Sequence, residues 1–139
     1  MNDKIKLNLG SGKKLKQGYI NIDILDCGQE IIRDLENQCI PLNSDSVDEI
    51  DADNFLEHVH NLWFVLDECW RVLKKDGTLN VIVPAGLNIA PDHYRYFNQK
   101  FFNHYITEGP KEYSFTKRLW KLLSYKETPT IIAKLTPKK

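Results

Sequence analysis

A glycine-rich turn near the amino terminus holds the first residues that could do chemistry. Gly10-Ser11-Gly12 directly follows a short apolar stretch at residues 5–9. Missing side chains at such a turn let a ligand approach the backbone, whose free N–H groups can bind the oxygens of a nucleotide. A dinucleotide site also needs a third small residue, where Leu15 stands, and an acid about 20 residues downstream. Because Asp23 follows Gly10 much sooner than that, NAD binding is disfavoured, and the turn by itself can equally serve only to reverse the chain.

Acidic side chains follow the predicted strands in series. Asp23 follows the second strand, Asp34 the third, and the stretch from Asp53 to Glu57 the fourth. Residues 20–60 contain eleven acids and a single base, Arg33. Because the carboxyl ends of parallel strands share one edge, these carboxylates predict an acidic crevice that suits a cationic ligand. Most of the acids can equally cap helices or solubilise turns, so we expect a function only for Asp23 and Asp34.

Short apolar stretches between turn residues predict the elements that position these groups. A helix is expected from Asn61 to Lys75, where apolar residues fall on one face and Asp76-Gly77 supplies the stop. With a strand on each side of it, this helix indicates a parallel sheet. The strands are expected at residues 5–9, 19–23, 30–34, 47–51 and 78–83.

The C-terminal part of the chain has a different pattern. A helix is expected over residues 98–106, and the spacing of Phe97 and Phe101 places both in the core. Residues 113–125 and 130–135 predict the two strands of an antiparallel hairpin, although 118–125 also fits a helix. Lysines concentrate in this hairpin, where we expect them to be solvated charges that protect edge strands.

The composition limits the class of protein. The chain has 139 residues, 42% of them hydrophobic, and balances 19 basic against 19 acidic side chains. This predicts one globular domain over residues 1–139 and argues against a general nucleic-acid binder, which carries a basic excess. The balance hides an uneven distribution, with net charges of −6 over residues 1–60, 0 over 61–110 and +6 over 111–139.

Targeting and metal-binding signals are not found in the sequence. The first residues resemble no signal peptide, and no stretch reaches the ~18 apolar residues of a membrane span. The cysteines, Cys27, Cys39 and Cys69, are odd in number and too widely spaced for a chelating pair. We therefore expect a cytoplasmic protein with reduced thiols that only fill space, no membrane contact and no metal site.

Several segments occur in a fixed order between Lys6 and Pro84: Leu7-Asn8-Leu9-Gly10-Ser11-Gly12, Gly18-Tyr19-Ile20-Asn21-Ile22-Asp23, Asp34-Leu35, Pro41-Leu42, Asp45-Ser46-Val47-Asp48-Glu49-Ile50, Leu56-Glu57-His58 and Arg71-Val72-Leu73-Lys74-Lys75-Asp76-Gly77. In this order they resemble the class I S-adenosylmethionine-dependent methyltransferases, and in particular their small type 11-like group. The resemblance implies an α/β fold with a Rossmann-like sheet that is mostly parallel and ends in an antiparallel hairpin. The early first strand implies that the usual N-terminal helix is lacking, and the link from Gly12 to Tyr19 is too short for the usual helix there.

The resemblance also implies which residues bind S-adenosylmethionine, the expected cofactor. Asp23 would bind the ribose hydroxyls next to Ile24. The aminoacyl end would lie against the glycine-rich turn, the adenine beside the Asp34 pair, and the methionine part near the loop after the fourth strand. The cofactor-binding residues implied in this way are Gly10, Ser11, Gly12, Asp23, Ile24, Asp34, Leu35, Asn54 and Glu57.

The implied reaction moves a methyl group to a small-molecule or saccharide acceptor. It needs alignment of the reacting atoms and, for a hydroxyl or amine acceptor, a base, for which His58 and His93 are the candidates. Each histidine can equally be structural. Two alternatives stay open: a non-catalytic cofactor-binding or scaffold protein, and an RNA- or protein-directed methyltransferase that docks through its basic hairpin. Nucleic acid is disfavoured as a partner by the charge balance, and a homodimer would cover an exposed cofactor site.

Overall fold

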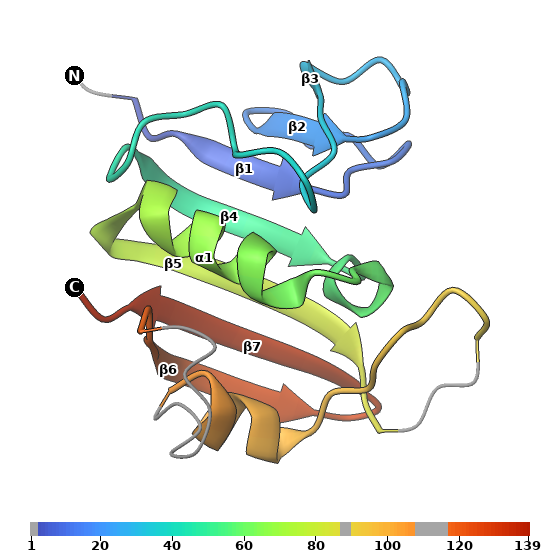
Figure 1. The fold of residues 1–139 in the computed structure, drawn as a ribbon, viewed down its shortest axis with the longest axis vertical. Coiled ribbons are helices and arrows are strands. Elements are labelled where there is room, and N and C mark those ends of the chain that lie inside the picture. The colour runs from blue at the N-terminus through green and yellow to red at the C-terminus, as the bar shows by residue number, and fades with distance from the viewer. Residues whose placement is uncertain (1–2, 87–89, 108–116) are drawn as a thin grey trace.

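Seven strands form one mixed sheet (Figure 1). The computed structural model describes residues 3–86, 90–107 and 117–139. The strands are β1 (Lys6–Leu9), β2 (Ile20–Asp23), β3 (Ile31–Ile32), β4 (Val47–Asp53), β5 (Leu73–Pro84), β6 (Trp120–Glu127) and β7 (Thr130–Pro137). They are ordered β3-β2-β1-β4-β5-β7-β6. Strands β1 to β5 pair in parallel, and β7 is antiparallel to both β5 and β6. This confirms the expected Rossmann-like sheet with a C-terminal hairpin.

Several strand bounds differ from the prediction, among them those of β3 and β6. β3 is only two residues long, because the chain then turns and the N–H groups of Asn37 and Gln38 donate to the carbonyl oxygen of Asp34. β6 begins at Trp120, and residues 113–116 of the predicted strand lie outside the described residues. The alternative of a helix over residues 118–125 is wrong, because residues 120–127 pair with β7.

Helix α1 (Leu62–Val72) ends three residues earlier than the sequence predicts. Leu73 is extended and fully buried, and it pairs with Val47 of β4, so the chain enters β5 directly. The exposed residues 74–76 form an irregularity in β5 before regular pairing resumes. A Cβ atom at Gly77 would lie only 2.9 Å from Leu73 Cδ2. The glycine therefore allows the chain to pass close to Leu73 as it re-enters the regular part of β5. It does not serve as the predicted helix stop.

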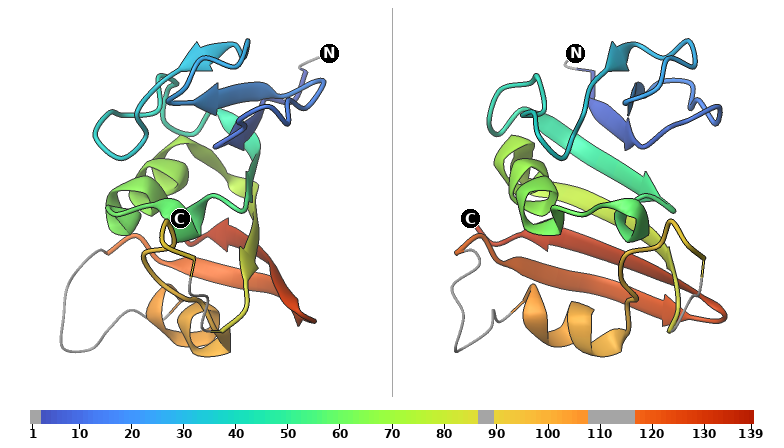
Figure 2. Two further views of the ribbon diagram at one scale, coloured as in Figure 1. Left: turned by 90° about the vertical axis from the view of Figure 1, so that its right-hand side faces the viewer. Right: turned by 45° about the vertical axis from the view of Figure 1, so that its right-hand side comes forward.

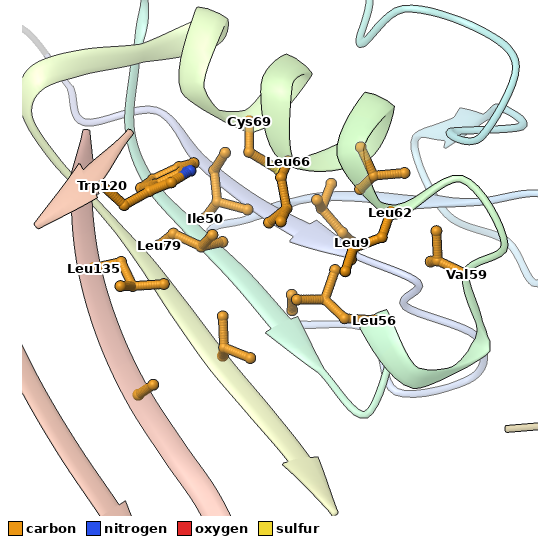
Figure 3. Close-up of a cluster of buried hydrophobic side chains, with 14 of the residues drawn as sticks. Leu9, Ile50, Leu56, Val59, Leu62, Leu66, Cys69, Leu79, Trp120 and Leu135 are labelled. Carbon is orange, nitrogen blue, oxygen red and sulfur yellow. The ribbon is translucent and has the colours of Figure 1, made fainter. Parts of the chain in front are cut away.

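The hydrophobic core lies between the sheet and α1 (Figure 3). Leu66 and Cys69 of α1 point toward the sheet, where Ile50 and Leu79 lie, and Trp120 borders the cluster from β6. Burial raises the pKa of the Cys69 thiol to about 12, so this cysteine is inert core filler, as expected. A helix able to cross a membrane is absent from the described part of the chain.

A short π-helix, η2 (Phe101–Tyr105), replaces the helix predicted over residues 98–106. Phe97 and Phe102 are buried, whereas Phe101 is only partly buried. The rings of Phe102 and Tyr125 lie 5.7 Å apart, which anchors η2 against β6. The interpretation of these aromatic residues as core is thus confirmed for Phe97 and, in part, for Phe101.

Both α1 and η2 lie on one face of the sheet, and within the described ranges no helix covers the opposite face (Figure 2). Short links, residues 10–19 and 24–30, connect β1 to β2 and β2 to β3. Neither link contains a helix, although parallel strands are usually joined by a helical crossover of a dozen or more residues. The strands alternate apolar and polar residues accordingly, like those of a sheet with one solvated face.

Asn21 organises the link between β1 and β2 on this polar face. It is 2% exposed, and its Oδ1 accepts hydrogen bonds from Asn8 Nδ2 at 2.8 Å and from the Lys16 N–H at 2.9 Å. Its Nδ2 donates to the Lys16 carbonyl oxygen and to Glu30 Oε2, both at 3.1 Å. Hydrogen bonds of side-chain amides thus fix the link to the sheet. A crossover helix in this position would be held by apolar contacts instead.

Lys16 extends the same network across the sheet to β4. Its Nζ donates to Asp51 Oδ2 and to Asp53 Oδ2, each at 2.7 Å. Burial on its own lowers the pKa of Lys16, but the hydrogen bonds and charges of the two carboxylates outweigh it and raise that pKa. Asn80 of β5 completes the network with hydrogen bonds to Glu49 and Asp51. The expectation that Asp53 faces the crevice is therefore wrong, because Lys16 holds it on the helix-free face.

A second polar cluster joins α1 to the loop before β4. Glu68, 6% exposed, accepts hydrogen bonds from Arg71 Nε at 2.8 Å and from the Ile40 N–H at 2.8 Å. The Arg71 guanidinium also donates to the carbonyl oxygens of Ile40 and Leu42. The pair therefore clamps this loop to the helix.

We expect acid to loosen this clamp. Burial on its own raises the pKa of Glu68, but hydrogen bonds from Arg71 and Ile40 outweigh it and lower the pKa below its ordinary value of 4.5. A carboxyl whose pKa is lower in the folded state stabilises the fold above its unfolded pKa, and this contribution is lost as the pH falls through the folded value. In urea unfolding, the free energy of unfolding of the wild type should therefore fall below about pH 4.5 more steeply than that of Glu68→Gln.

The glutamine variant is the control because it keeps an acceptor but cannot titrate. Near neutral pH we expect it to be less stable than the wild type by about 1–2 kcal/mol, since it loses charged hydrogen bonds. Equal slopes for the two proteins in acid would show that Glu68 does not contribute to acid unfolding.

Candidate functional site

A cavity of about 270 Å³ lies at the carboxyl ends of β1, β2 and β4. Its lining residues are Gly10, Asp23, Ile24, Arg33, Asp34, Leu35, Glu36, Asn54, Phe55, His58 and Val59. Seven of the predicted site residues are among them, since the strand ends do share one edge. The predicted residues that do not line the cavity are Ser11, Gly12, Glu57 and His93.

Gly10 and Phe55 form one wall of the cavity. Gly10 has a φ of +63°, which favours glycine, and a Cβ there would lie 2.4 Å from Phe55 Cδ1. The missing side chain therefore lets the phenylalanine ring pack directly on the turn after β1. Asn54, at the end of β4, also has a positive φ, 51°, and its N–H donates to the Ile82 carbonyl oxygen at 2.7 Å. This bond fixes the direction in which the chain leaves the sheet.

The Asp23 carboxylate joins the turn after β1 to the end of β2. Its Oδ2 accepts a hydrogen bond from the Gly12 N–H at 2.8 Å, and its Oδ1 accepts one from the Leu25 N–H at 3.0 Å. Each carboxylate oxygen can accept a second hydrogen bond, so Asp23 retains capacity for a ligand. Gly12 contacts Asp23 through its backbone N–H. Ser11 is 5% exposed, and its N–H donates to the Ile22 carbonyl oxygen. These two residues shape the turn.

Three carboxylates and one guanidinium line the cavity. The Asp34 oxygens accept hydrogen bonds from the Glu36 N–H and from Asn37 Nδ2, at 3.1 and 2.7 Å. The Arg33 Nε donates to the carbonyl oxygen of Cys39, outside the cavity. The excess of negative charge favours a cationic ligand, as the acidic N-terminal half predicts.

Sequence reasoning missed four of the lining residues: Arg33, Glu36, Phe55 and Val59. The signal for Phe55 was a large apolar residue directly after the strand-end position Asn54. Glu36 has no local signal, because its role depends on distant groups. Its Oε1 accepts hydrogen bonds from the N–H groups of His60 and Asn61, at 2.5 and 2.9 Å.

Both candidate bases lie in a cluster beside the cavity, with Glu57. Glu57 and His58 belong to the short 3₁₀ helix η1 (Leu56–His58), and the rings of His58 and His93 have their centroids 4.7 Å apart. Glu57 is 1% exposed, and burial raises its pKa. Only His58 also lines the cavity. Glu57 itself does not line the cavity, because its side chain is buried, and its contact with a cofactor stays a prediction.

Comparison with known proteins identifies the family. The model of the type 11 methyltransferase domain matches residues 11–81, just over half of the chain. A search among curated proteins found no significant sequence match.

The fold is shared with solved methyltransferase structures. One is 1,6-didemethyltoxoflavin-N1-methyltransferase from Burkholderia thailandensis, solved with 1,6-didemethyltoxoflavin and S-adenosylhomocysteine bound: it is 12% identical, with a TM-score of 0.72, and the match covers 97% of this chain and 71% of that one. Two others are SAM-dependent methyltransferases, from Archaeoglobus fulgidus (13% identity, TM-score 0.66, 97% and 86% covered) and from Aquifex aeolicus (15%, 0.63, 98% and 84%). Together with the matched family model, the strand order and the strand-end residues show that the chain belongs to the type 11 group of the class I S-adenosylmethionine-dependent methyltransferases.

Proposed function

We propose that the cavity holds S-adenosylmethionine and that the chain transfers its methyl group to a small-molecule or saccharide acceptor. The observation that carries this proposal is the acidic cavity at the ends of β1, β2 and β4, with the Asp23 carboxylate on its wall. The volume of about 270 Å³ is slightly below the ~300–1,000 Å³ of typical ligand sites, which suits a cofactor cleft that the acceptor helps to close.

The residues present fit this cofactor. S-adenosylmethionine has a ribose diol, for which the free acceptor capacity of Asp23 is suitable. Its sulfonium and ammonium groups are cations, and the cavity carries three carboxylates against one guanidinium. Leu35 offers an apolar surface next to Asp34, as the adenine ring needs, and Gly10 and Asn54 line the part proposed for the methionine end. Ser11 and Gly12 do not line the cavity, and they contribute to cofactor binding by shaping the turn that presents Gly10 and Asp23.

The bound cofactor supplies an electrophilic methyl group on its sulfonium. The protein has to align the acceptor with that methyl group and exclude water. Of the two candidate bases, His58 is the better placed because it lines the cavity. Its Nδ1 lies 3.0 Å from the carbonyl oxygen of Asp92, which fixes the orientation of the ring. His93 supports His58 from behind, with the two rings edge to face.

The basic hairpin gives little support to the alternative of an RNA-directed enzyme. Lys138 Nζ donates to the Thr107 carbonyl oxygen at 2.7 Å, and Lys139 Nζ donates to that of Leu73. Arg118 donates to the Asp67 carbonyl oxygen. Three of the C-terminal cations, which flank the strands of the hairpin, are thus engaged with the protein itself.

Isothermal titration with S-adenosylmethionine and S-adenosylhomocysteine tests the cofactor site. We expect both to bind, and we expect methyl-labelled cofactor to transfer label to a small-molecule or saccharide fraction. Binding without transfer to any fraction would favour a non-catalytic protein. Transfer to RNA or protein fractions alone would replace the proposed acceptor class, and failure of both cofactors to bind would overturn the proposal.

A further inference from the structure

The cluster beside the cavity brings together three side chains that commonly bind metals. Glu57, His58 and His93 each offer a ligand atom, and these atoms all lie within 4.8 Å of one another. Two imidazoles and one carboxylate form a donor set found in catalytic zinc sites and in non-haem iron sites. The sequence spacing conceals this set, because α1 and β5 separate Glu57 from His93 in the chain.

The hydrogen bonding of His58 determines which of its nitrogens is free. Its Nδ1 lies 3.0 Å from the carbonyl oxygen of Asp92 and 3.3 Å from Asp92 Oδ2. A carbonyl oxygen can only accept, so Nδ1 carries a proton, and in the neutral ring Nε2 then has the lone pair. This Nε2 lies 3.4 Å from Glu57 Oε1. Two acceptors therefore face each other, and a positive charge belongs between them.

A proton does not satisfy this arrangement. A charge-assisted hydrogen bond between nitrogen and oxygen is about 2.7–2.9 Å long, shorter than the distance from Nε2 to Oε1. Among the described residues, both carboxylate oxygens of Glu57 and the Nδ1 of His93 are buried without a hydrogen-bond partner. One proton can bridge at most two of these three atoms and leaves the third without a partner, which is costly in a protein interior. A single metal cation can serve the carboxylate and both imidazoles at once.

We propose that Glu57, His58 and His93 bind one divalent transition-metal ion of the Zn²⁺ type at the edge of the cavity. Zinc bonds of about 2.0–2.2 Å place tetrahedral ligand atoms roughly 3.4 Å apart, so no two of the three atoms have to close by more than about 1.4 Å. Asp92 supports the site from behind, as the carboxylate and carbonyl partners of metal-bound histidines usually do.

This site extends the proposed methyl transfer but does not depend on it. Three protein ligands leave a fourth position of a tetrahedral ion open. Because His58 also lines the cavity, we expect an oxygen of the acceptor to occupy that position. A metal-bound oxygen has a lowered pKa, so the ion would take over the role proposed for His58 as a base.

Titration of chelator-treated protein with Co²⁺ alone tests the site by visible ligand-field absorption. We expect one Co²⁺ ion per chain, displaced by Zn²⁺, and a Zn²⁺-dependent rise in Tm. We expect Glu57→Gln and His93→Gln to weaken Co²⁺ binding at least about tenfold. The matched control is His60→Gln, which changes an exposed histidine outside the cluster that contacts Tyr94 and should bind Co²⁺ as the wild type does.

The wild-type titration is decisive even if a variant fails to fold. Neither an absorption band nor a Tm shift in the wild type would overturn the proposal. Equal Co²⁺ affinities in folded Glu57→Gln, His93→Gln and His60→Gln would also overturn it. Cofactor binding is measured separately on metal-free protein. If the wild type binds Co²⁺ but does not bind S-adenosylhomocysteine, only the proposed function is refuted.

Discussion

Asp23→Asn is expected to lower the affinity for S-adenosylhomocysteine by about 100-fold. The carboxylate lines the cavity, and each of its oxygens has acceptor capacity beyond its backbone hydrogen bond. Asparagine retains one acceptor oxygen but loses the charge and the second acceptor that a ribose diol requires. Hydrogen bonds to charged groups contribute about 1.5–3 kcal/mol, and 1.4 kcal/mol corresponds to a tenfold change in affinity. Isothermal titration calorimetry measures the change directly.

The matched control for this variant is Asp26→Asn. Asp26 is exposed, lies in the same link after β2 and is absent from the cavity wall. The Asp26→Asn variant should therefore bind S-adenosylhomocysteine with wild-type affinity. Circular dichroism checks that Asp23→Asn keeps its fold, because the variant also changes the contact with the Gly12 N–H. A loss below about threefold in the folded variant would remove Asp23 from the cofactor site.

Asn21→Ala is expected to lower the free energy of unfolding by about 3 kcal/mol. The substitution removes the side chain on which the link from β1 to β2 is built, and it leaves Asn8 Nδ2 and the Lys16 N–H without that partner. Each buried group left without a partner costs about 1–3 kcal/mol. Urea denaturation at neutral pH measures the loss through the shift of its midpoint.

Asn103→Ala provides the comparison for the second variant. Asn103 is an exposed asparagine on η2, so its removal should change stability by less than about 0.5 kcal/mol. If Asn21→Ala unfolds at the same urea concentration as Asn103→Ala, the amide network is not what stabilises the link. Asn21→Leu adds a second test, because an apolar side chain would be tolerated there only if the amide hydrogen bonds contribute little.

Local signals predicted the strand ends and the residues placed on them. Alternation and turn residues are properties of neighbouring positions, so Gly10, Asp23 and Asp34 could be assigned to one edge of the sheet from the sequence. The end of α1 was not predictable in this way. It depends on the pairing of Leu73 with Val47, which lies at the start of β4, before the whole of η1 and α1.

The buried cluster was missed for the same physical reason. Glu57 follows a strand end and therefore resembled a ligand-binding acid, but its side chain is turned inward, toward His58 and His93. That direction depends on the path of the chain near residue 93. The missing helix between β1 and β2, by contrast, was visible in the sequence, because the link from Gly12 to Tyr19 is too short for it.

The two short links of the sheet also bear on the order in which the protein folds. The pairings of β1 with β2 and of β2 with β3 each join strands that are consecutive in the chain. The pairing of β5 with β7 is far less local, because η2 and β6 lie between these two strands in the chain. Since the entropy lost on closing a loop grows with its length, local pairs can form early and distant pairs slow the rate. We therefore expect the first three strands to assemble before the hairpin pairs with β5. The part of the cavity that the ends of β1 and β2 form would then be among the earliest parts of the sheet to fold.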